Sequence, residues 1–174
     1  MAKNVVFDWD GVFIKQTEYI CNALKMPVPD EYDALDAHNI SLVQAITLQL
    51  SYNDMDLYEH IPFEDGFDEV FSLCPPPYIY TGSTGASMKM FKETVVTHYA
   101  PNFPRDHLII ADGRDKPALP FADIVIEDGP RYLDLYDDKV VKILIDHFYN
   151  RNAKGPYIRV PTLRAAIEYV KKLV

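Results

Sequence analysis

Five short runs rich in β-branched and aromatic residues recur along this chain, and each is followed directly by polar or small residues. The runs cover residues 5–7, 78–80, 107–111, 124–126 and 140–145. Two other stretches, residues 87–99 and 164–173, have the apolar spacing of helices. Strands that alternate with helices predict a parallel sheet with crossover connections. We therefore expect an α/β protein with a doubly wound parallel sheet.

The segment between the first two predicted strands has a different character. It contains few β-branched runs, and several of its apolar residues recur at helical spacing. These are Leu42, Val43, Ile46 and Leu50. We interpret residues 13–73 as a small helical cap inserted after the first strand, with residues 1–12 and 74–174 forming the core. The length of 174 residues suits one core domain with such an insertion.

Charge and composition exclude several classes of partner. The chain has 17 basic and 26 acidic residues, a formal net charge of −9, which argues against extended nucleic acid or an anionic membrane surface. No apolar run approaches the roughly 20 residues that span a bilayer, and the first residues do not form a secretory signal. Cys21 and Cys74 show no metal or disulfide pattern. We expect a cytoplasmic protein, and a homodimer is left open.

The first predicted strand runs directly into a pair of aspartates. Asp8, Trp9, Asp10 and Gly11 follow it. Two carboxylates held two residues apart at the end of a buried strand repel each other when both are ionised, and each loses hydration. A divalent cation relieves both effects, and hard oxygen ligands favour magnesium over zinc. Solvated turns capped by an aspartate show the same pattern, so the motif alone leaves both interpretations open.

Polar groups also follow the later predicted strands. Thr81 and Gly82 end the second, where glycine lets backbone amides approach an anion. Lys116 follows the third strand, and Glu127 and Asp128 end the fourth. Because the carboxyl ends of parallel strands meet at one edge of a sheet, we expect these groups to converge with the two aspartates of the first motif.

This order of motifs resembles the haloacid dehalogenase (HAD) superfamily of aspartate-nucleophile phosphatases. The shared pattern is a strand ending in Asp-x-Asp-Gly, a strand ending in Thr, a lysine, and a strand ending in acidic residues. Within that superfamily the chain looks most similar to the 5'(3')-deoxyribonucleotidases. The finer likeness rests on residues 61–67, on Lys116 lying seven residues before Asp123, on residues 143–150 and on Arg159.

The resemblance implies a role for each carboxylate. Asp8 would be the nucleophile that forms an aspartyl-phosphate, and Asp10 would act as general acid and then as general base. Mg²⁺ would be held by the side chains of Asp8 and Asp128 and by the backbone carbonyl of Asp10. Glu127 would lie behind these ligands and hold a metal-bound water or Lys116.

The remaining implied groups bind the phosphate. Lys116 would neutralise the phosphate and the nucleophile, while Thr81 and the amide of Gly82 would bind a phosphoryl oxygen. The chain departs from the family pattern at Glu127, where two adjacent aspartates are usual, at Gly82 after the motif threonine, and at residues 74–77.

The function that this resemblance implies is a Mg²⁺-dependent phosphatase acting on deoxynucleoside and other nucleoside monophosphates. The same chemistry on another small phosphate, such as a sugar phosphate or phosphoglycolate, or on nucleic-acid ends, is the alternative. A non-catalytic binding module on the same scaffold is least favoured, because Asp8, Asp10, Lys116 and Asp128 are all present.

Overall fold

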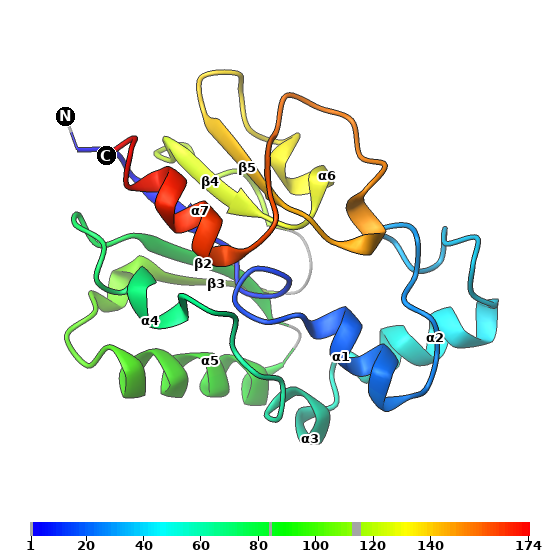
Figure 1. Cartoon of the computed structure of the whole chain (residues 1–174). Helices are drawn as coiled ribbons and strands as arrows, with labels where there is room; N and C mark the ends of the chain where they lie inside the picture. The colour runs from blue at the N-terminus through cyan, green and yellow to red at the C-terminus, as the bar shows by residue number, and fades with distance from the viewer. Residues whose placement is uncertain (1, 84, 113–115) are drawn as a thin grey trace.

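The computed structural model describes residues 2–83, 85–112 and 116–174. This part of the chain forms a sheet of six parallel strands in the order β3-β2-β1-β4-β5-β6 (Figure 1). The strands are β1 (Val5–Phe7), β2 (Tyr78–Ser83), β3 (Leu108–Asp112), β4 (Ile124–Glu127), β5 (Val141–Ile145) and β6 (Ile158–Val160). The parallel α/β sheet is thereby confirmed, and the five predicted strands differ from the observed ones by at most three residues at either end.

Strand β6 is the element that the sequence analysis missed. It has three residues, with Arg159 in the middle, and it lies at the edge of the sheet beside β5. A buried strand needs an apolar run, whereas an edge strand is covered less and tolerates a charged residue. Three residues are also too few for a period-2 pattern to stand out.

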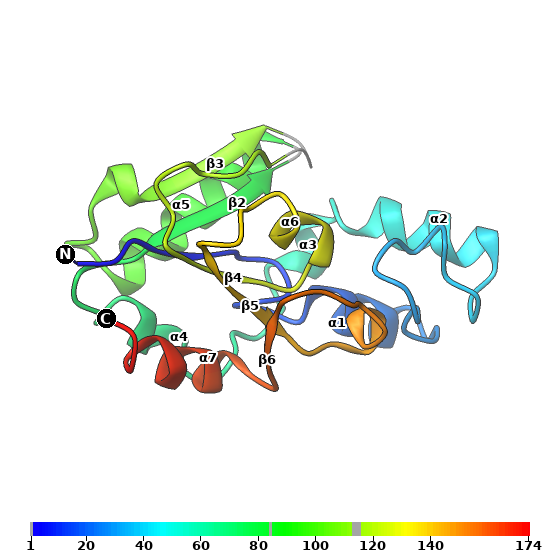
Figure 2. The ribbon, with the colours of Figure 1, turned by 90° about the horizontal axis from the view of Figure 1, so that it is seen from above.

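Helices cover both faces of the sheet, which makes it doubly wound (Figure 2). Side chains alternate along β1, so Phe7 faces one layer and Val6 the other. The Phe7 layer contains α4, α5 and α7, and the Val6 layer contains α6. These helices are α4 (Phe67–Val70), α5 (Ala86–Tyr99), α6 (Pro130–Leu133) and α7 (Leu163–Val170), with short 3₁₀ turns at η1 (Arg105–His107) and η2 (Phe148–Asn150).

Four helices lie in the segment inserted between β1 and β2, which the structure describes in full. Its helices are α1 (Gln16–Ala23), α2 (Leu42–Ser51), α3 (Met55–Tyr58) and α4. Helices α1 and α2 share a small apolar cluster that includes Ile20 and Leu48, and they project from one end of the sheet (Figure 1). In contrast, Phe67 and Val70 of α4 pack in the main hydrophobic cluster with α7. The insertion therefore packs partly on itself and partly on the sheet.

Helix α2 turns most of its apolar residues outward. Leu42, Val43 and Leu50 are each about 70% exposed, and Ile46 is 47% exposed. Their spacing predicted the helix correctly, but its buried face carries Ala45 and Leu48 instead. Ser41 and Gln44 begin the helix with reciprocal hydrogen bonds between side chain and backbone.

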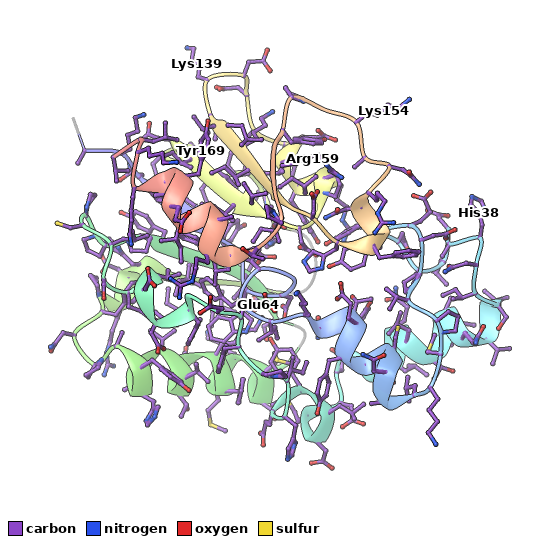
Figure 3. The ribbon with its side chains drawn as sticks, viewed as in Figure 1. His38, Glu64, Lys139, Lys154, Arg159 and Tyr169 are labelled. Carbon is purple, nitrogen blue, oxygen red and sulfur yellow. The ribbon has the colours of Figure 1, made fainter. Side chains whose placement is uncertain are left out.

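The loop before α2 lies at the outer edge of the insertion, where His38 is exposed (Figure 3). No helix in the described ranges is both long enough and apolar enough to cross a membrane.

Candidate active site

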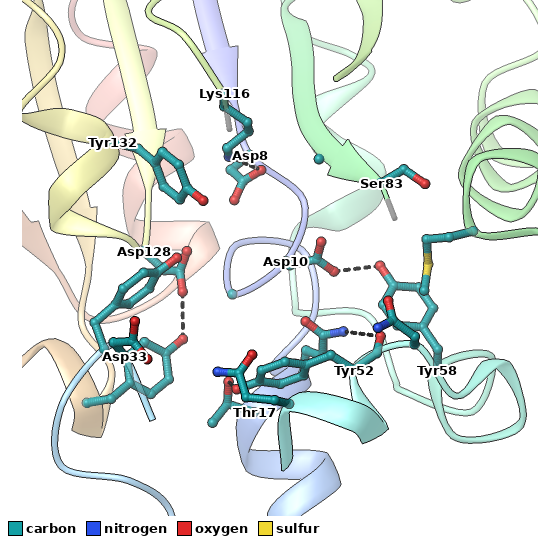
Figure 4. Close-up of a pocket in the computed structure, with 18 of the residues that line it drawn as sticks. Asp8, Asp10, Thr17, Asp33, Tyr52, Tyr58, Ser83, Lys116, Asp128 and Tyr132 are labelled. Atoms are coloured by element: carbon teal, nitrogen blue, oxygen red, sulfur yellow. Dashed lines mark hydrogen bonds and ion pairs between the residues drawn. The ribbon is translucent and has the colours of Figure 1, made fainter. Parts of the chain in front are cut away.

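The strand order fixes where a ligand can bind. Strands β2 and β3 lie on one side of β1, and β4, β5 and β6 lie on the other. The order in which strands are added to the sheet therefore switches sides between β1 and β4. In open parallel sheets the binding crevice lies outside the carboxyl ends of the strands at such a point. Asp8 follows β1 and Asp128 follows β4, and Phe7 pairs with Ile126 in register. Both aspartates therefore enter the same crevice (Figure 4).

A buried carboxylate cluster occupies this crevice. Ligand oxygens of Asp8, Glu127 and Asp128 all lie within 4.8 Å of one another. Lys116 Nζ lies 2.7 Å from Asp8 Oδ1 and 2.5 Å from Glu127 Oε1. The other oxygen of Glu127 accepts hydrogen bonds from the backbone N–H groups of Asp128 (3.0 Å) and Gly129 (3.1 Å). Glu127 thus holds Lys116 on one side and the turn after β4 on the other.

Burial raises the pKa of each carboxyl group in the cluster. Desolvation and the negative charge of Glu127 raise the pKa of Asp8 to about 7. Desolvation also raises the pKa of Glu127 to about 7 against the charge of Lys116, and that of Asp128 to about 6 against the charge of His147. Burial works against the ammonium of Lys116, but the charges of Asp8 and Glu127 outweigh it and raise the pKa of this lysine, which therefore stays protonated.

The charge balance of the cluster fits a divalent cation. Within the described ranges, the ammonium of Lys116 contacts two of the three buried carboxylates, those of Asp8 and Glu127, so full ionisation leaves the cluster with an excess of negative charge. Buried charges in proteins are paired or bind metal. The cluster offers only carboxylate oxygens, and such a donor set suits a hard cation such as Mg²⁺.

Gly11 is required by the close approach of Asp128. Its φ is +76°, which favours glycine, and a Cβ at this position would lie 2.2 Å from both Cγ and Oδ2 of Asp128. The side chain of Asp128, after β4, therefore packs directly against the backbone of Gly11 in the turn after β1. This contact brings the Asp8-to-Asp10 motif against Asp128.

Residues after β5 form hydrogen bonds with both Asp128 and Gly11. Tyr149 donates a hydrogen bond of 2.7 Å to Asp128 Oδ2, and Asn150 donates one of 2.8 Å to the backbone carbonyl of Asp128. His147 Nε2 lies 2.6 Å from the carbonyl oxygen of Gly11. The sequence places His147 and Asn150 directly after the last predicted strand, where they can reach the edge of the site.

His147 also joins the inserted segment to the site. Its Nδ1 lies 2.7 Å from Glu18 Oε1 in α1. Burial disfavours the imidazolium, but the hydrogen bond that His147 donates to Glu18 and the charges of Asp128 and Glu18 raise the pKa of His147 above its usual value. The charged form can donate from both ring nitrogens, which matches its two acceptors.

Asp10 is held by two residues that the sequence analysis missed. Tyr58 of α3 donates a hydrogen bond of 2.6 Å to Asp10 Oδ1 (Figure 4). Lys92 of α5 donates one of 2.8 Å to Asp10 Oδ2 and one of 2.7 Å to Thr81 Oγ1. Thr81 is fully buried, with its hydroxyl turned toward Lys92, and among the described residues Gly82 and Ser83 line the crevice in its place.

The sequence did contain a signal for Lys92. The buried face of α5 consists of Met88, Lys92, Val95 and Val96, which is an apolar stripe at helical spacing with one lysine inside it. A lysine is almost never fully buried unless it is paired. Such a position therefore predicts an acidic partner, although the sequence does not say which one.

The crevice continues past the carboxylates into a pocket of about 170 Å³. One side comes from the inserted segment, and its lining residues are Gln16, Thr17, Gln49, Tyr52 and Asn53. The other side carries Tyr32 and Asp33, which also belong to the inserted segment, together with Arg131 and Tyr132 of α6. Tyr52 thus presents an aromatic ring to the pocket. Trp9 and Phe13 are fully buried in the main hydrophobic cluster, and Tyr19 packs against it.

Comparisons with known proteins place the fold. No protein-family model matches the sequence, and no curated protein is similar enough to count as a relative. Solved structures do match over nearly the whole chain. A HAD hydrolase from Bacillus subtilis, solved bound to magnesium, is 13% identical with a TM-score of 0.52, covering 97% of this chain and 98% of its own.

Two further structures agree. A HAD hydrolase of family IA, variant 3, from Entamoeba histolytica is 18% identical with a TM-score of 0.50, covering 94% of both chains. A protein from Clostridium acetobutylicum, described as a predicted phosphatase, is 15% identical with a TM-score of 0.53, covering 99% of this chain and 98% of its own. The chain therefore has the fold of the HAD hydrolases.

Proposed function

We propose that the protein is a magnesium-dependent phosphomonoester hydrolase with Asp8 as its nucleophile. The observation that carries this proposal is the contact of Asp8 with Lys116 inside a buried carboxylate cluster at the mouth of a pocket. A buried aspartate beside a cation, facing a cavity, suits nucleophilic attack on a bound anion. The HAD hydrolase of the same fold that was solved with magnesium supports the choice of metal.

The reaction proceeds in two steps. A carboxylate oxygen of Asp8 bonds to phosphorus while the bond from phosphorus to the ester oxygen breaks, and Asp10 protonates the departing alkoxide. Asp10 then takes a proton from water, which attacks phosphorus, releases phosphate and restores the Asp8 carboxylate. Both aspartates line the same pocket, which this sequence of steps requires.

The negative charge on the transferring phosphoryl group would be stabilised from several directions. Lys116 lies against Asp8 and would neutralise the phosphate as it reaches the nucleophile. The backbone of Gly82 lines the pocket and would offer its amide to a phosphoryl oxygen. Mg²⁺ held by Asp8, Asp128 and the Asp10 backbone carbonyl would supply screening between the anionic nucleophile and the anionic substrate.

We propose nucleoside monophosphates as the substrate class. The pocket beyond the carboxylates combines amide side chains at Gln16, Gln49 and Asn53 with aromatic rings at Tyr32 and Tyr52. Amides can pair with the hydrogen-bonding edge of a base, and aromatic rings can stack on its face. A sugar phosphate or phosphoglycolate would use the amides but has no planar ring to stack on the aromatic side chains.

Phosphate release from a panel of substrates tests both levels of the proposal. The panel contains dUMP, dTMP, UMP, glucose 6-phosphate and phosphoglycolate, each with Mg²⁺ and with a chelator. We expect hydrolysis of the nucleotides that stops with the chelator and in Asp8→Asn. The control is Asp112→Asn, an exposed aspartate at the end of β3, which should keep wild-type activity.

The results of this panel distinguish a wrong nucleophile from a wrong substrate class. Activity retained in Asp8→Asn would contradict the assigned nucleophile. Metal-dependent activity confined to glucose 6-phosphate or phosphoglycolate would keep the mechanism and reject the nucleotide.

A further inference from the structure

The ammonium of Lys92 is buried and surrounded by hydrogen-bond acceptors and aromatic rings. Its side chain is 1% exposed, and its Nζ donates to Asp10 Oδ2 at 2.8 Å, Thr81 Oγ1 at 2.7 Å and the Gly82 carbonyl at 3.2 Å. An ammonium has three donors, so all of them are used. The same nitrogen lies 5.5 Å from the ring centroid of Trp9 and 5.8 Å from that of Tyr58. These rings add cation–π attraction.

Packing alone does not explain why a lysine is buried at position 92. Desolvation of an ammonium amounts to several kcal/mol, and only good geometry with full hydrogen bonding offsets it. A methionine could fill the same stripe position beside Met88 without that penalty. The charge is therefore best explained by the group that it holds, and Asp10 is its acidic partner.

Asp10 is gripped at both carboxylate oxygens. Tyr58 from α3 holds Oδ1, and Lys92 from α5 holds Oδ2. The side chain of Asp10 is still 32% exposed, and it lines the pocket. It is thus fixed in direction while remaining open to a ligand. Asp8 has a separate lysine, Lys116, so the two aspartates of the motif are held by different cations.

We propose that Lys92 is a positioning residue that aims the Asp10 carboxyl group at the leaving-group oxygen. This inference rests on the proposed function, because it assigns to Lys92 a task in the acid step of that reaction. Lys92 acts through Asp10, and its three donors are already engaged within the protein. Misplacing a catalytic group by about 1 Å can reduce a rate about 10²-fold.

Leaving-group dependence tests the assignment. Phenyl phosphate needs its departing oxygen protonated, whereas 4-nitrophenyl phosphate releases a stabilised anion that needs little help from an acid. The quantity to measure is kcat/KM, because hydrolysis of the aspartyl-phosphate does not enter it. General acid catalysis contributes about 10²–10⁴-fold. We expect Lys92→Met to lose about 30–100-fold on phenyl phosphate and less than about 5-fold on 4-nitrophenyl phosphate.

Two further variants sharpen the comparison. Lys89→Met removes an exposed lysine from the same helix and should match wild type on both substrates. In an Asp10→Asn background, Lys92→Met should add less than about 2-fold on phenyl phosphate, because residues that act through one another are not additive. Equal losses on both phosphates, or full additivity with Asp10→Asn, would overturn the positioning role and indicate binding of the phosphate or general stability.

A crystal structure of Lys92→Met gives a readout that does not depend on activity. We expect the Asp10 carboxylate to leave its contact with Tyr58 while Asp8 and Lys116 keep theirs. An unmoved Asp10 overturns the inference. Lys92→Gln serves in the same way if the Met variant does not fold. Wild-type protein that is inactive on every phosphate would reject the proposed function instead, and the crystal structure would then decide the role of Lys92 alone.

Discussion

Replacing Gly11 with alanine should disrupt both stability and the carboxylate cluster. The backbone there has φ +76°, and placing alanine in the left-handed region costs about 1–2 kcal/mol. The new Cβ would lie 2.2 Å from the carboxyl group of Asp128, which must move and give up the hydrogen bond from Tyr149. A hydrogen bond to a charged group contributes about 1.5–3 kcal/mol. We therefore expect Gly11→Ala to lose about 2.5–5 kcal/mol of unfolding free energy.

Urea and thermal unfolding, each with and without Mg²⁺, measure this effect. For a chain of this size 1 kcal/mol shifts Tm by about 2–4 °C, so the expected drop is about 5–20 °C. Wild type should gain stability from Mg²⁺, and Gly11→Ala should not. The control is Gly85→Ala, where nothing lies within 4 Å of the new Cβ and φ is extended, with a change below about 1 kcal/mol. A Gly11→Ala protein within about 1 kcal/mol of wild type that still responds to Mg²⁺ would refute the reasoning.

Three other changes should have measurable effects. Removing Mg²⁺ with a chelator should lower the Tm of wild type, since a ligand at 100 times its Kd adds about 2.7 kcal/mol; an unchanged Tm would contradict the cation site. Tyr149→Phe should weaken Mg²⁺ binding about 10–100-fold in a calorimetric titration, because Asp128 loses the partner that orients it, and equal affinity would show that this hydrogen bond is dispensable. Hydrogen bonds from Arg164 lower the pKa of Asp65, so this pair stabilises the fold at pH values above the ordinary aspartate pKa and loses that effect as the pH falls. The Tm difference between wild type and Arg164→Met should therefore shrink from pH 6 to pH 3. A constant difference would argue against the pair.

The sheet and the ends of its inner strands were predictable because their signals are local. Strands β1, β4 and β5 each contain an apolar run of three residues, and an acidic residue follows each run. Parallel order then follows from the intervening helices, and it brings Asp8 and Asp128 together without any further information. Strand β6 escaped because an edge strand with a central Arg159 carries no apolar run.

The supporting contacts were not predictable, because each depends on where a long side chain points. Tyr58 reaches Asp10 across 48 residues, and Tyr149 reaches Asp128 across 21. A tyrosine in a helical turn looks like any other partly apolar residue until its hydroxyl is placed. The hydroxyl of Thr81 illustrates the same limit, since the sequence placed it at the end of β2 but its direction is set by Lys92. The outward face of α2 also required coordinates, because spacing alone does not tell which side of a helix is covered.

The hydrogen bond between His147 and the Gly11 carbonyl joins parts of the chain that the ribosome makes at very different times. The two residues are 136 positions apart, and Tyr149 and Asn150 from the same late segment hold Asp128. While the chain is still growing, the early aspartates have none of these partners and stay hydrated. The concentration of charge in the crevice is therefore assembled only after residues 147–150 have been made, so a chain that stops before them would carry the motif without the environment that makes it reactive.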